Sequence, residues 1–129
     1  MDPLQSFIAT AGTVVLGYLV VKTVLNSGIK SIKYEEAKPL LAQKNKTLLL
    51  DVRTPTEFAG RHAKGALNIP SGDLKNRLAE LDKYKDKTVI VICASGARSA
   101  LAARTLHKNG FTDVLNFSGG MTEWRGETQ

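Results

Sequence analysis

The sequence predicts an α/β domain with a mostly parallel sheet and helices on both faces, preceded by one transmembrane helix. Two observations predict the domain: apolar runs of strand length alternate with helical patterns, and the strongest runs, residues 47–52 and 88–92, are continuously apolar at their centres. Continuous runs are typical of strands covered on both faces, and the alternation is typical of parallel sheets. The third observation is that residues 3–21 carry no charged side chain.

The uncharged N-terminal stretch has the length of a membrane span. Residues 3–21 correspond to about 28 Å of helix at ~1.5 Å per residue, close to the ~30 Å hydrocarbon core of a bilayer. We therefore expect an anchor over residues 1–28, with residues 4–25 in the membrane. Two alternatives stay open: a cleaved signal peptide, which would need a basic start that is missing here, and a core or interfacial helix.

Charges flanking this stretch predict its orientation. Three lysines follow it and one aspartate precedes it (Lys22, Lys30, Lys33 and Asp2). The positive-inside rule then makes the chain a single-pass membrane protein whose C-terminal domain, residues 29–129, lies in the cytoplasm. Small residues recur every four positions in the stretch, a spacing that also suits self-association of the anchor.

Local patterns predict the elements of the domain in order. Thr54, Pro55 and Glu57 have the pattern of a capping box with proline in the first turn of a helix. Gly110 suits the end of a later helix. The expected elements are a basic linker from residue 26, a helix at 35–44, a strand at 47–52, a helix from 54, a short strand at 66–70, a helix at 71–81, a strand at 88–92, a helix from about 99 to 110, a strand at 113–117 and a short helix at 119–124.

The composition argues against several classes of function. The net charge of +6 comes from scattered lysines and arginines, and no basic run is interleaved with aromatic residues, so a nucleic-acid partner is not expected. A single cysteine excludes an internal disulfide. Neither a second thiol nor a histidine cluster offers metal-ligand spacing, so no metal is expected.

The one cysteine, Cys93, follows the strand at 88–92 and precedes four small residues and Arg98. Ligands bind at the carboxyl ends of strands in open α/β sheets. A tight loop lets backbone N–H groups converge on the sulfur while leaving it accessible. The helix that follows adds the positive end of its dipole, and Arg98 adds a cation. All three favour a nucleophilic thiolate, whereas the alternative is a buried, inert cysteine.

Five motifs carry a family resemblance. They are LLLDVRTPTEF (48–58), HAKGALNIP (62–70), CASGARS (93–99), NGF (109–111) and GGMTEW (119–124). From about Ile32 to Trp124 the chain therefore resembles a single-domain rhodanese, the thiosulfate sulfurtransferase family, and the fold expected for residues 29–129 is rhodanese-like.

The resemblance implies a function and a set of site residues. Cys93 would take a sulfane sulfur from a small-molecule donor such as thiosulfate, hold it as a persulfide and pass it to a thiophilic acceptor, cyanide in vitro and a thiol in the cell. Asp51 and Arg53 would support the loop, and no cofactor is implied. The substrate-binding residues would be those that follow the cysteine: Ala94, Ser95, Gly96, Ala97, Arg98 and Ser99.

Two positions depart from the family pattern. Arg61 stands where glycine is common, which puts the local turn geometry in question. Ala94 stands where a basic residue is common, so anionic donors are expected to bind more weakly. Of the other candidates, His62 is expected to pack a loop, His107 to be solvated and Trp124 to close the core.

Two other functions stay open. The Cys-to-Arg loop also suits a phosphatase of related fold, but it is one residue shorter than such enzymes need. The domain would alternatively be a non-catalytic docking or sulfur-sensing module at the membrane, although the presence of Cys93 counts against this.

Overall fold

The computed structural model describes residue 3, residues 12–16 and residues 29–129. The expected anchor, residues 1–28, thus lies largely outside the described residues. The short described piece at 12–16 is helical, and the side chains of Val14, Val15 and Leu16 are exposed. Among the described residues, no helix is both long enough and apolar enough to cross a bilayer.

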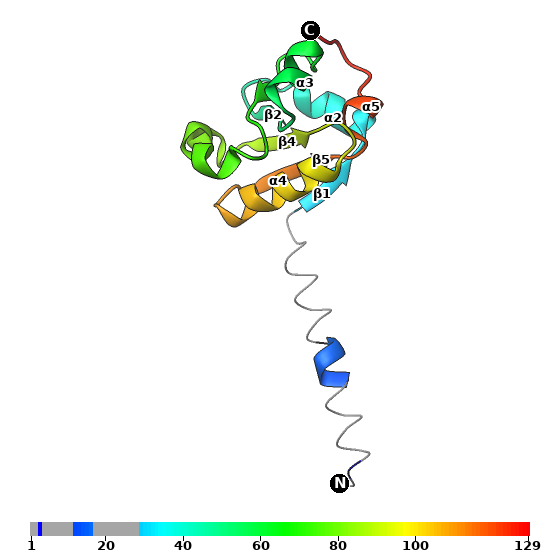
Figure 1. Ribbon diagram of the computed structural model, residues 1–129, viewed down its shortest axis with the longest axis vertical. Coiled ribbons are helices and arrows are strands. Elements are labelled where there is room, and N and C mark those ends of the chain that lie inside the picture. The colour runs from blue at the N-terminus through cyan, green and yellow to red at the C-terminus, as the bar shows by residue number, and fades with distance from the viewer. Residues whose placement is uncertain (1–2, 4–11, 17–28) are drawn as a thin grey trace.

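Within residues 29–129 a five-stranded sheet forms the centre of the domain, in the order β1-β5-β4-β2-β3 (Figure 1). Its strands are β1 (Ile29–Ile32), β2 (Thr47–Asp51), β3 (Leu67–Asn68), β4 (Thr88–Ile92) and β5 (Asp113–Phe117). Neighbouring strands of this described sheet pair in parallel throughout. In β2 and β4 every residue after the first is buried, as their continuous apolar runs predict.

Helices cover both faces of this sheet. They are α2 (Tyr34–Leu41), α3 (Pro55–Gly60), the 3₁₀ helix η1 (Leu74–Tyr84), α4 (Ala97–Lys108) and α5 (Gly120–Glu123). Alternate side chains of β4 enter different cores: Val89 and Val91 pack with η1 and α4, whereas Ile90 and Ile92 pack with α2 and α5. The period of two expected of a strand thus builds a core on each face, and the predicted α/β architecture is confirmed.

β1 corrects one expectation, since the sequence predicts a linker at residues 29–32. The strand pairs with β5 from Ile29↔Val114 to Ile32↔Phe117. It lies at the edge of the sheet and buries only Ile32 among its own residues. Short edge strands with charged residues are common, and such a pattern lacks the apolar run that reveals a central strand.

Two helix starts determine where the site residues lie. The capping box of α3 is confirmed, because Thr54 Oγ1 accepts from the Glu57 N–H at 3.2 Å and the Thr54 N–H donates to Glu57 Oε1 at 3.1 Å. α4 begins at Ala97, earlier than expected, with Gly96 as its N-cap at φ +106°. Arg98 therefore belongs to the first turn of α4 rather than to the loop before it.

One other expectation needs correction in detail. The apolar spacing at 71–81 predicts a helix, and the structure has a 3₁₀ helix that begins at Leu74. Over so few turns, leucines three and four apart do not distinguish the two helix types. Pro39 lies in the second half of α2, which ends two residues later.

Candidate active site

Cys93 directly follows β4 at the carboxyl edge of the sheet, as the sequence predicts. Its side chain is 1 % exposed and belongs to the core beneath α4, so the expectation of an accessible sulfur is wrong for this structure. In the loop that follows, Ala94 and Gly96 are half-buried, while Ser95 and Ala97 are exposed. The loop closes over the sulfur because its own polar groups bond to it.

Polar groups of the loop and of α4 surround the Cys93 sulfur. The Gly96 N–H donates to Sγ at 3.0 Å, and the thiol donates to Ser99 Oγ at 3.3 Å. Ser99 is buried in the first turn of α4. The loop and the helix start therefore place donors and a hydroxyl around one sulfur atom.

These contacts change the acidity of the thiol. Burial on its own raises the pKa of Cys93. In the thiolate, which has no proton to donate, the Ser99 hydroxyl donates to the sulfur and lowers this pKa, as do the backbone N–H groups of Ser99, Gly96 and Ser95. The net effect is a pKa below the ordinary value of a thiol. A lowered pKa is the property that the chemistry of a nucleophilic cysteine requires.

Asn116, which the sequence analysis did not single out, holds Ser99 in place. It is buried near the end of β5, and the Ser99 hydroxyl lies 2.6 Å from Asn116 Oδ1. The same hydroxyl lies 3.1 Å from the Gly96 carbonyl oxygen. The sequence offered one signal that Asn116 belongs to the site: it is a polar residue within the run DVLNF, at the carboxyl end of a strand.

The start of α5 packs directly on the loop. The Met121 N–H donates to the Cys93 carbonyl at 2.8 Å, and the Thr122 N–H donates to the Ala94 carbonyl at 3.3 Å. Gly120, at φ +55°, lies so close that a Cβ there would be 2.3 Å from the Cys93 carbonyl oxygen. The second glycine of the GGMTEW motif is thus required by a close approach of backbone to backbone.

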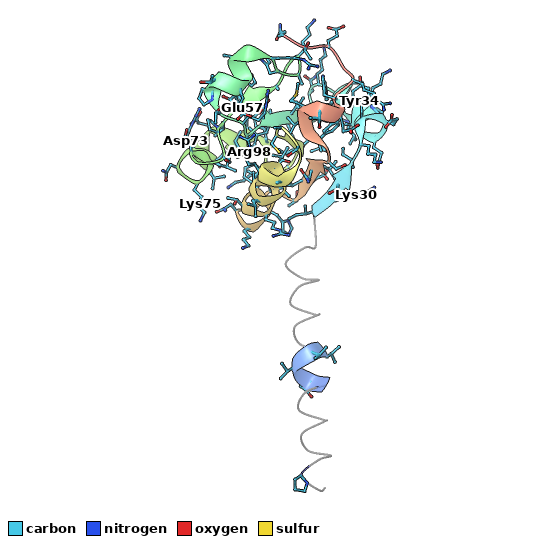
Figure 2. The ribbon with its side chains drawn as sticks, turned by 45° about the vertical axis from the view of Figure 1, so that its right-hand side comes forward. Lys30, Tyr34, Glu57, Asp73, Lys75 and Arg98 are labelled. Carbon is cyan, nitrogen blue, oxygen red and sulfur yellow. The ribbon has the colours of Figure 1, made fainter. Side chains whose placement is uncertain are left out.

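The hydrogen bonds of Arg98 do not go to the Cys93 sulfur, although its positive charge acts on Cys93 from a distance. Its guanidinium forms a two-point ion pair with Glu57 of α3, with Nη1–Oε1 at 2.7 Å and Nη2–Oε2 at 2.9 Å. Figure 2 shows the two residues on neighbouring helices. Hydrogen bonds from Arg98, and then from Thr54, lower the pKa of Glu57 to about 2.

Asp51 and Arg53 form a buried ion pair at the end of β2, with Nη2–Oδ2 at 2.8 Å. Arg53 also donates to the carbonyl oxygens of Arg61, at 2.7 Å, and Glu57, at 3.4 Å. The pair therefore supports α3 and the turn after it. Its link to the Cys93 loop is indirect and passes through the Glu57–Arg98 ion pair.

The remaining candidates lie away from the sulfur. His62 stacks on Phe58 with ring centroids 3.8 Å apart and packs the turn after α3, as expected. His107 is half-buried with its Nδ1 enclosed and without a hydrogen-bond partner in the structure, so the expectation of a solvated ring is wrong. Trp124 packs edge-on against Phe117, as expected of a core-closing residue.

The departure at Arg61 has no effect on the turn. Its φ is −168°, which is extended backbone that any residue adopts, so glycine is not needed there. Within the described part of the chain, no three His, Cys, Asp or Glu side chains gather as metal ligands would.

A cavity of about 310 Å³ lies between α4 and the start of η1. It is lined by Arg98, Leu101, Ser71 and Lys75, among others. A larger cavity of about 590 Å³ lies between α2, β2 and the C-terminal segment and includes no residue of the Cys93 loop. The smaller cavity reaches the site only through Arg98 and, like the larger one, includes none of residues 93–97.

Comparison with known proteins decides the family, since residues 33–127 match the family model of the rhodanese-like domain. The chain belongs to the rhodanese-like domain family. YqhL of Bacillus subtilis, an uncharacterized protein, is 40 % identical to this rhodanese-like chain over 111 residues, which are 85 % of the chain and 84 % of that protein. A sulfurtransferase of Allochromatium vinosum is 36 % identical over 96 residues, 74 % of this chain and 88 % of that protein.

A solved structure agrees with these relatives. The crystal structure of a rhodanese-like domain protein from Staphylococcus aureus has a TM-score of 0.67 and 34 % identity, and the match covers 76 % of this chain and 93 % of that one. The rhodanese-like fold expected from the sequence motifs is confirmed. The family and its sulfurtransferase member support a role in sulfur transfer.

Replacing Gly120 by alanine tests the contact between α5 and the loop of this rhodanese-like domain. We expect Gly120→Ala to lower the free energy of unfolding by about 2–4 kcal/mol, because the left-handed backbone and the clash with the Cys93 carbonyl both oppose a Cβ. Denaturant unfolding measures the change. Gly60→Ala, where a Cβ meets nothing within 4 Å, is the control and should change stability little. A Gly120→Ala protein as stable as the wild type would contradict the backbone contact.

Replacing Ser99 tests the origin of the lowered thiol pKa. We expect Ser99→Ala to raise the pKa of Cys93, because the largest lowering contact is lost while burial remains. At any pH near the wild-type pKa, the variant then holds less thiolate. The ultraviolet absorbance of the thiolate reports this without ambiguity, since Cys93 is the only cysteine of the chain.

Ser95→Ala is the matched control for Ser99→Ala. Ser95 lowers the pKa of Cys93 through its backbone N–H, which alanine keeps, and its side chain is exposed. The control should therefore titrate like the wild type. Equal titration curves for Ser99→Ala and the wild type would show that the hydroxyl does not set the acidity of the thiol.

Proposed function

We propose that this chain is a sulfurtransferase in which Cys93 carries the transferred sulfur. The observation that carries the proposal is the hydrogen-bonded sulfur, contacted by the Gly96 N–H and the Ser99 hydroxyl at the start of α4. These contacts favour the thiolate, and the thiolate is the nucleophile in sulfur transfer. The sulfurtransferase relative and the family match support the same chemistry.

In the first step the Cys93 thiolate attacks the outer sulfur of a donor. With thiosulfate, a new S–S bond forms on Cys93 while the donor's S–S bond breaks, and sulfite leaves with its electron pair. The product on the protein is a Cys93 persulfide, whose negative outer sulfur is stabilised by nearby N–H donors. The residues proposed to surround the donor are those at 94–99, from the loop and the first turn of α4.

In the second step a thiolate acceptor attacks the outer sulfur of the Cys93 persulfide. The acceptor gains the sulfur as its own persulfide, and the Cys93 thiolate leaves. No external oxidant or reductant is consumed, because the S–S bond that forms replaces the one that breaks. Two half-reactions through a covalent intermediate predict ping-pong kinetics, with cyanide as an acceptor in vitro.

The two alternatives have weaker support. A phosphatase must hold a tetrahedral phosphoryl group with three oxygens around the attacked atom, whereas this short loop bonds directly to the sulfur through Gly96. A docking or sensing module would not need the lowered thiol pKa of Cys93. Persulfide formation on the protein favours the transferase over both.

We also propose that residues 1–28 anchor the domain, residues 29–129, to a membrane with the domain on the cytoplasmic side. The uncharged stretch at 3–21 supports this. In the described helical turn at 12–16, apolar side chains are exposed to the surroundings rather than packed on the domain, which favours a lipid environment over a core helix.

Replacing Cys93 by serine tests the catalytic role. We expect Cys93→Ser to reduce sulfur transfer from thiosulfate to cyanide to the rate without protein, because the chain has no second thiol. Intact-mass measurement should show the gain of one sulfur atom by the wild type after thiosulfate treatment, and its loss after a thiol acceptor is added. Circular dichroism establishes that the variant is folded. Near-normal transfer by folded Cys93→Ser would rule out the proposed mechanism.

Fractionation tests the anchor. We expect the full-length chain to stay with membranes after a carbonate wash, because residues 4–25 would lie in the hydrocarbon core. A chain that starts at Ile29 keeps β1 whole and should be soluble with the same rate of sulfur transfer. Full-length chain that is soluble without detergent would exclude the anchor, and a shortened mature chain would favour a signal peptide.

A further inference from the structure

The ion pair between Arg98 and Glu57 joins two elements on either side of the site. Arg98 lies in the first turn of α4 and Glu57 in the first turn of α3. The two contacts measure 2.7 and 2.9 Å, and the side chains are 38 % and 35 % exposed. The pair is therefore within reach of a small molecule that approaches the loop (Figure 2).

The ion pair determines the charge that the CASGARS segment brings to the site. Between Cys93 and Arg98 the loop has only uncharged residues, so Arg98 is the one cation that the CASGARS sequence supplies. Its guanidinium interacts most strongly with Glu57 and more weakly with Cys93 and Asp51. Asp51 is itself paired with Arg53. The carboxylate of Glu57 thus cancels the positive charge that would otherwise attract an anion.

Glu57 is fixed in this position from a second side. Its Oε1 also accepts from the Thr54 N–H at 3.1 Å in the capping box. Because hydrogen bonds from Arg98 and Thr54 lower its pKa to about 2, the carboxylate is ionised at neutral pH. The pair is thus a constant feature of the resting site.

Sulfur donors differ in the charge that they bring to the loop. Thiosulfate carries two negative charges on the group that bears the transferred sulfur, and it approaches a thiolate. Methanethiosulfonate has the same S–SO₂ unit with a methyl group in place of one oxygen, and it carries one negative charge. An unpaired Arg98 would attract the thiosulfate dianion more strongly than the methanethiosulfonate monoanion. When Glu57 neutralises Arg98, thiosulfate loses this advantage in binding.

We propose that Glu57 determines donor specificity: by pairing with Arg98, it makes the site favour sulfane donors of low negative charge, such as thiol persulfides and thiosulfonates, over thiosulfate. This inference rests on the sulfurtransferase function proposed above. Glu57 is a positioning residue in this scheme because it acts through Arg98. In the sequence, this position has the pattern of a helix cap.

Glu57→Gln tests the inference with little change of shape. Glutamine also serves at the third helical position of a capping box, so the start of α3 is kept. The variant cannot neutralise Arg98. In the full-length chain, kept in non-ionic detergent, we expect the ratio of kcat/KM for thiosulfate to kcat/KM for methanethiosulfonate to rise about tenfold. The rise should shrink with added salt, because screening weakens the attraction between exposed charges.

The chain offers a matched control in η1. Arg77 and Glu80 form a similar two-point pair, with contacts of 2.7 and 3.0 Å, among residues outside the loop. Glu80→Gln removes the same charge and should leave the donor ratio unchanged. In the double variant Glu57→Gln/Arg98→Gln the rise should disappear, since the freed cation is absent.

A second variant keeps the test decisive if glutamine disturbs α3. Glu57→Asp has a shorter carboxylate that cannot reach both guanidinium nitrogens, so the ratio should move in the same direction by a smaller factor. An unchanged ratio in both Glu57 variants, or an equal rise in Glu80→Gln, would overturn the inference while sulfur transfer stands. No sulfur on Cys93 of the wild type from either donor would overturn the proposed function as well.

Discussion

The hydrogen bonds that the Cys93 and Ala94 carbonyl groups accept from α5 determine which way the peptide groups of the loop face. In a trans peptide the C=O and the following N–H point in opposite directions. The Ala94 carbonyl is bonded to the Thr122 N–H, so the Ser95 N–H is turned toward the opposite side. That N–H is one of the groups that lower the pKa of Cys93. The acidity of the thiol therefore depends on a contact made on the far side of the loop.

This arrangement explains why glycines surround the site. Gly120 brings α5 against the Cys93 carbonyl, and a Cβ on Gly96 would lie 3.2 Å from the Gly119 nitrogen. Gly96 also adopts the left-handed conformation that lets its N–H turn toward the sulfur before α4 begins. The packing of α5 on the Cys93 loop thus has two results: the two backbones approach closely, and the N–H groups of the loop face the sulfur. Asn116 completes this arrangement by holding the Ser99 hydroxyl against the sulfur.

Structural features that depend on a few consecutive residues could be predicted from the sequence. The continuous apolar runs placed β2 and β4, and the run before Cys93 placed the thiol at the carboxyl edge of the sheet. Thr54 and Glu57 predicted the start of α3 because a capping box depends on four consecutive residues. Edge strand β1 was missed because its four residues lack an apolar run, although its pairing with β5 is regular.

The polar contacts of the site were less predictable, because they join segments far apart in sequence. Arg98 was expected to supply a cation to the site, but its partner Glu57, which α3 brings to it from 41 residues away, was not foreseen. Asn116 reaches Ser99 only because β5 lies beside β4 in the sheet. Burial of the sulfur likewise depends on the packing of α4 against β4, which no pattern within the CASGARS motif reveals. Position in the fold could thus be predicted from the sequence, but the partners of each side chain could not.

A crystal structure of the protein after treatment with a sulfane donor tests the central claim most directly, that the loop N–H groups stabilise sulfur on Cys93. The account predicts a second sulfur bonded to Sγ within hydrogen-bond distance of the Ser95 and Gly96 N–H groups. It also predicts that the Cys93 and Ala94 carbonyls remain bonded to α5. An unmodified Cys93, or an outer sulfur that points away from every loop N–H, would contradict it.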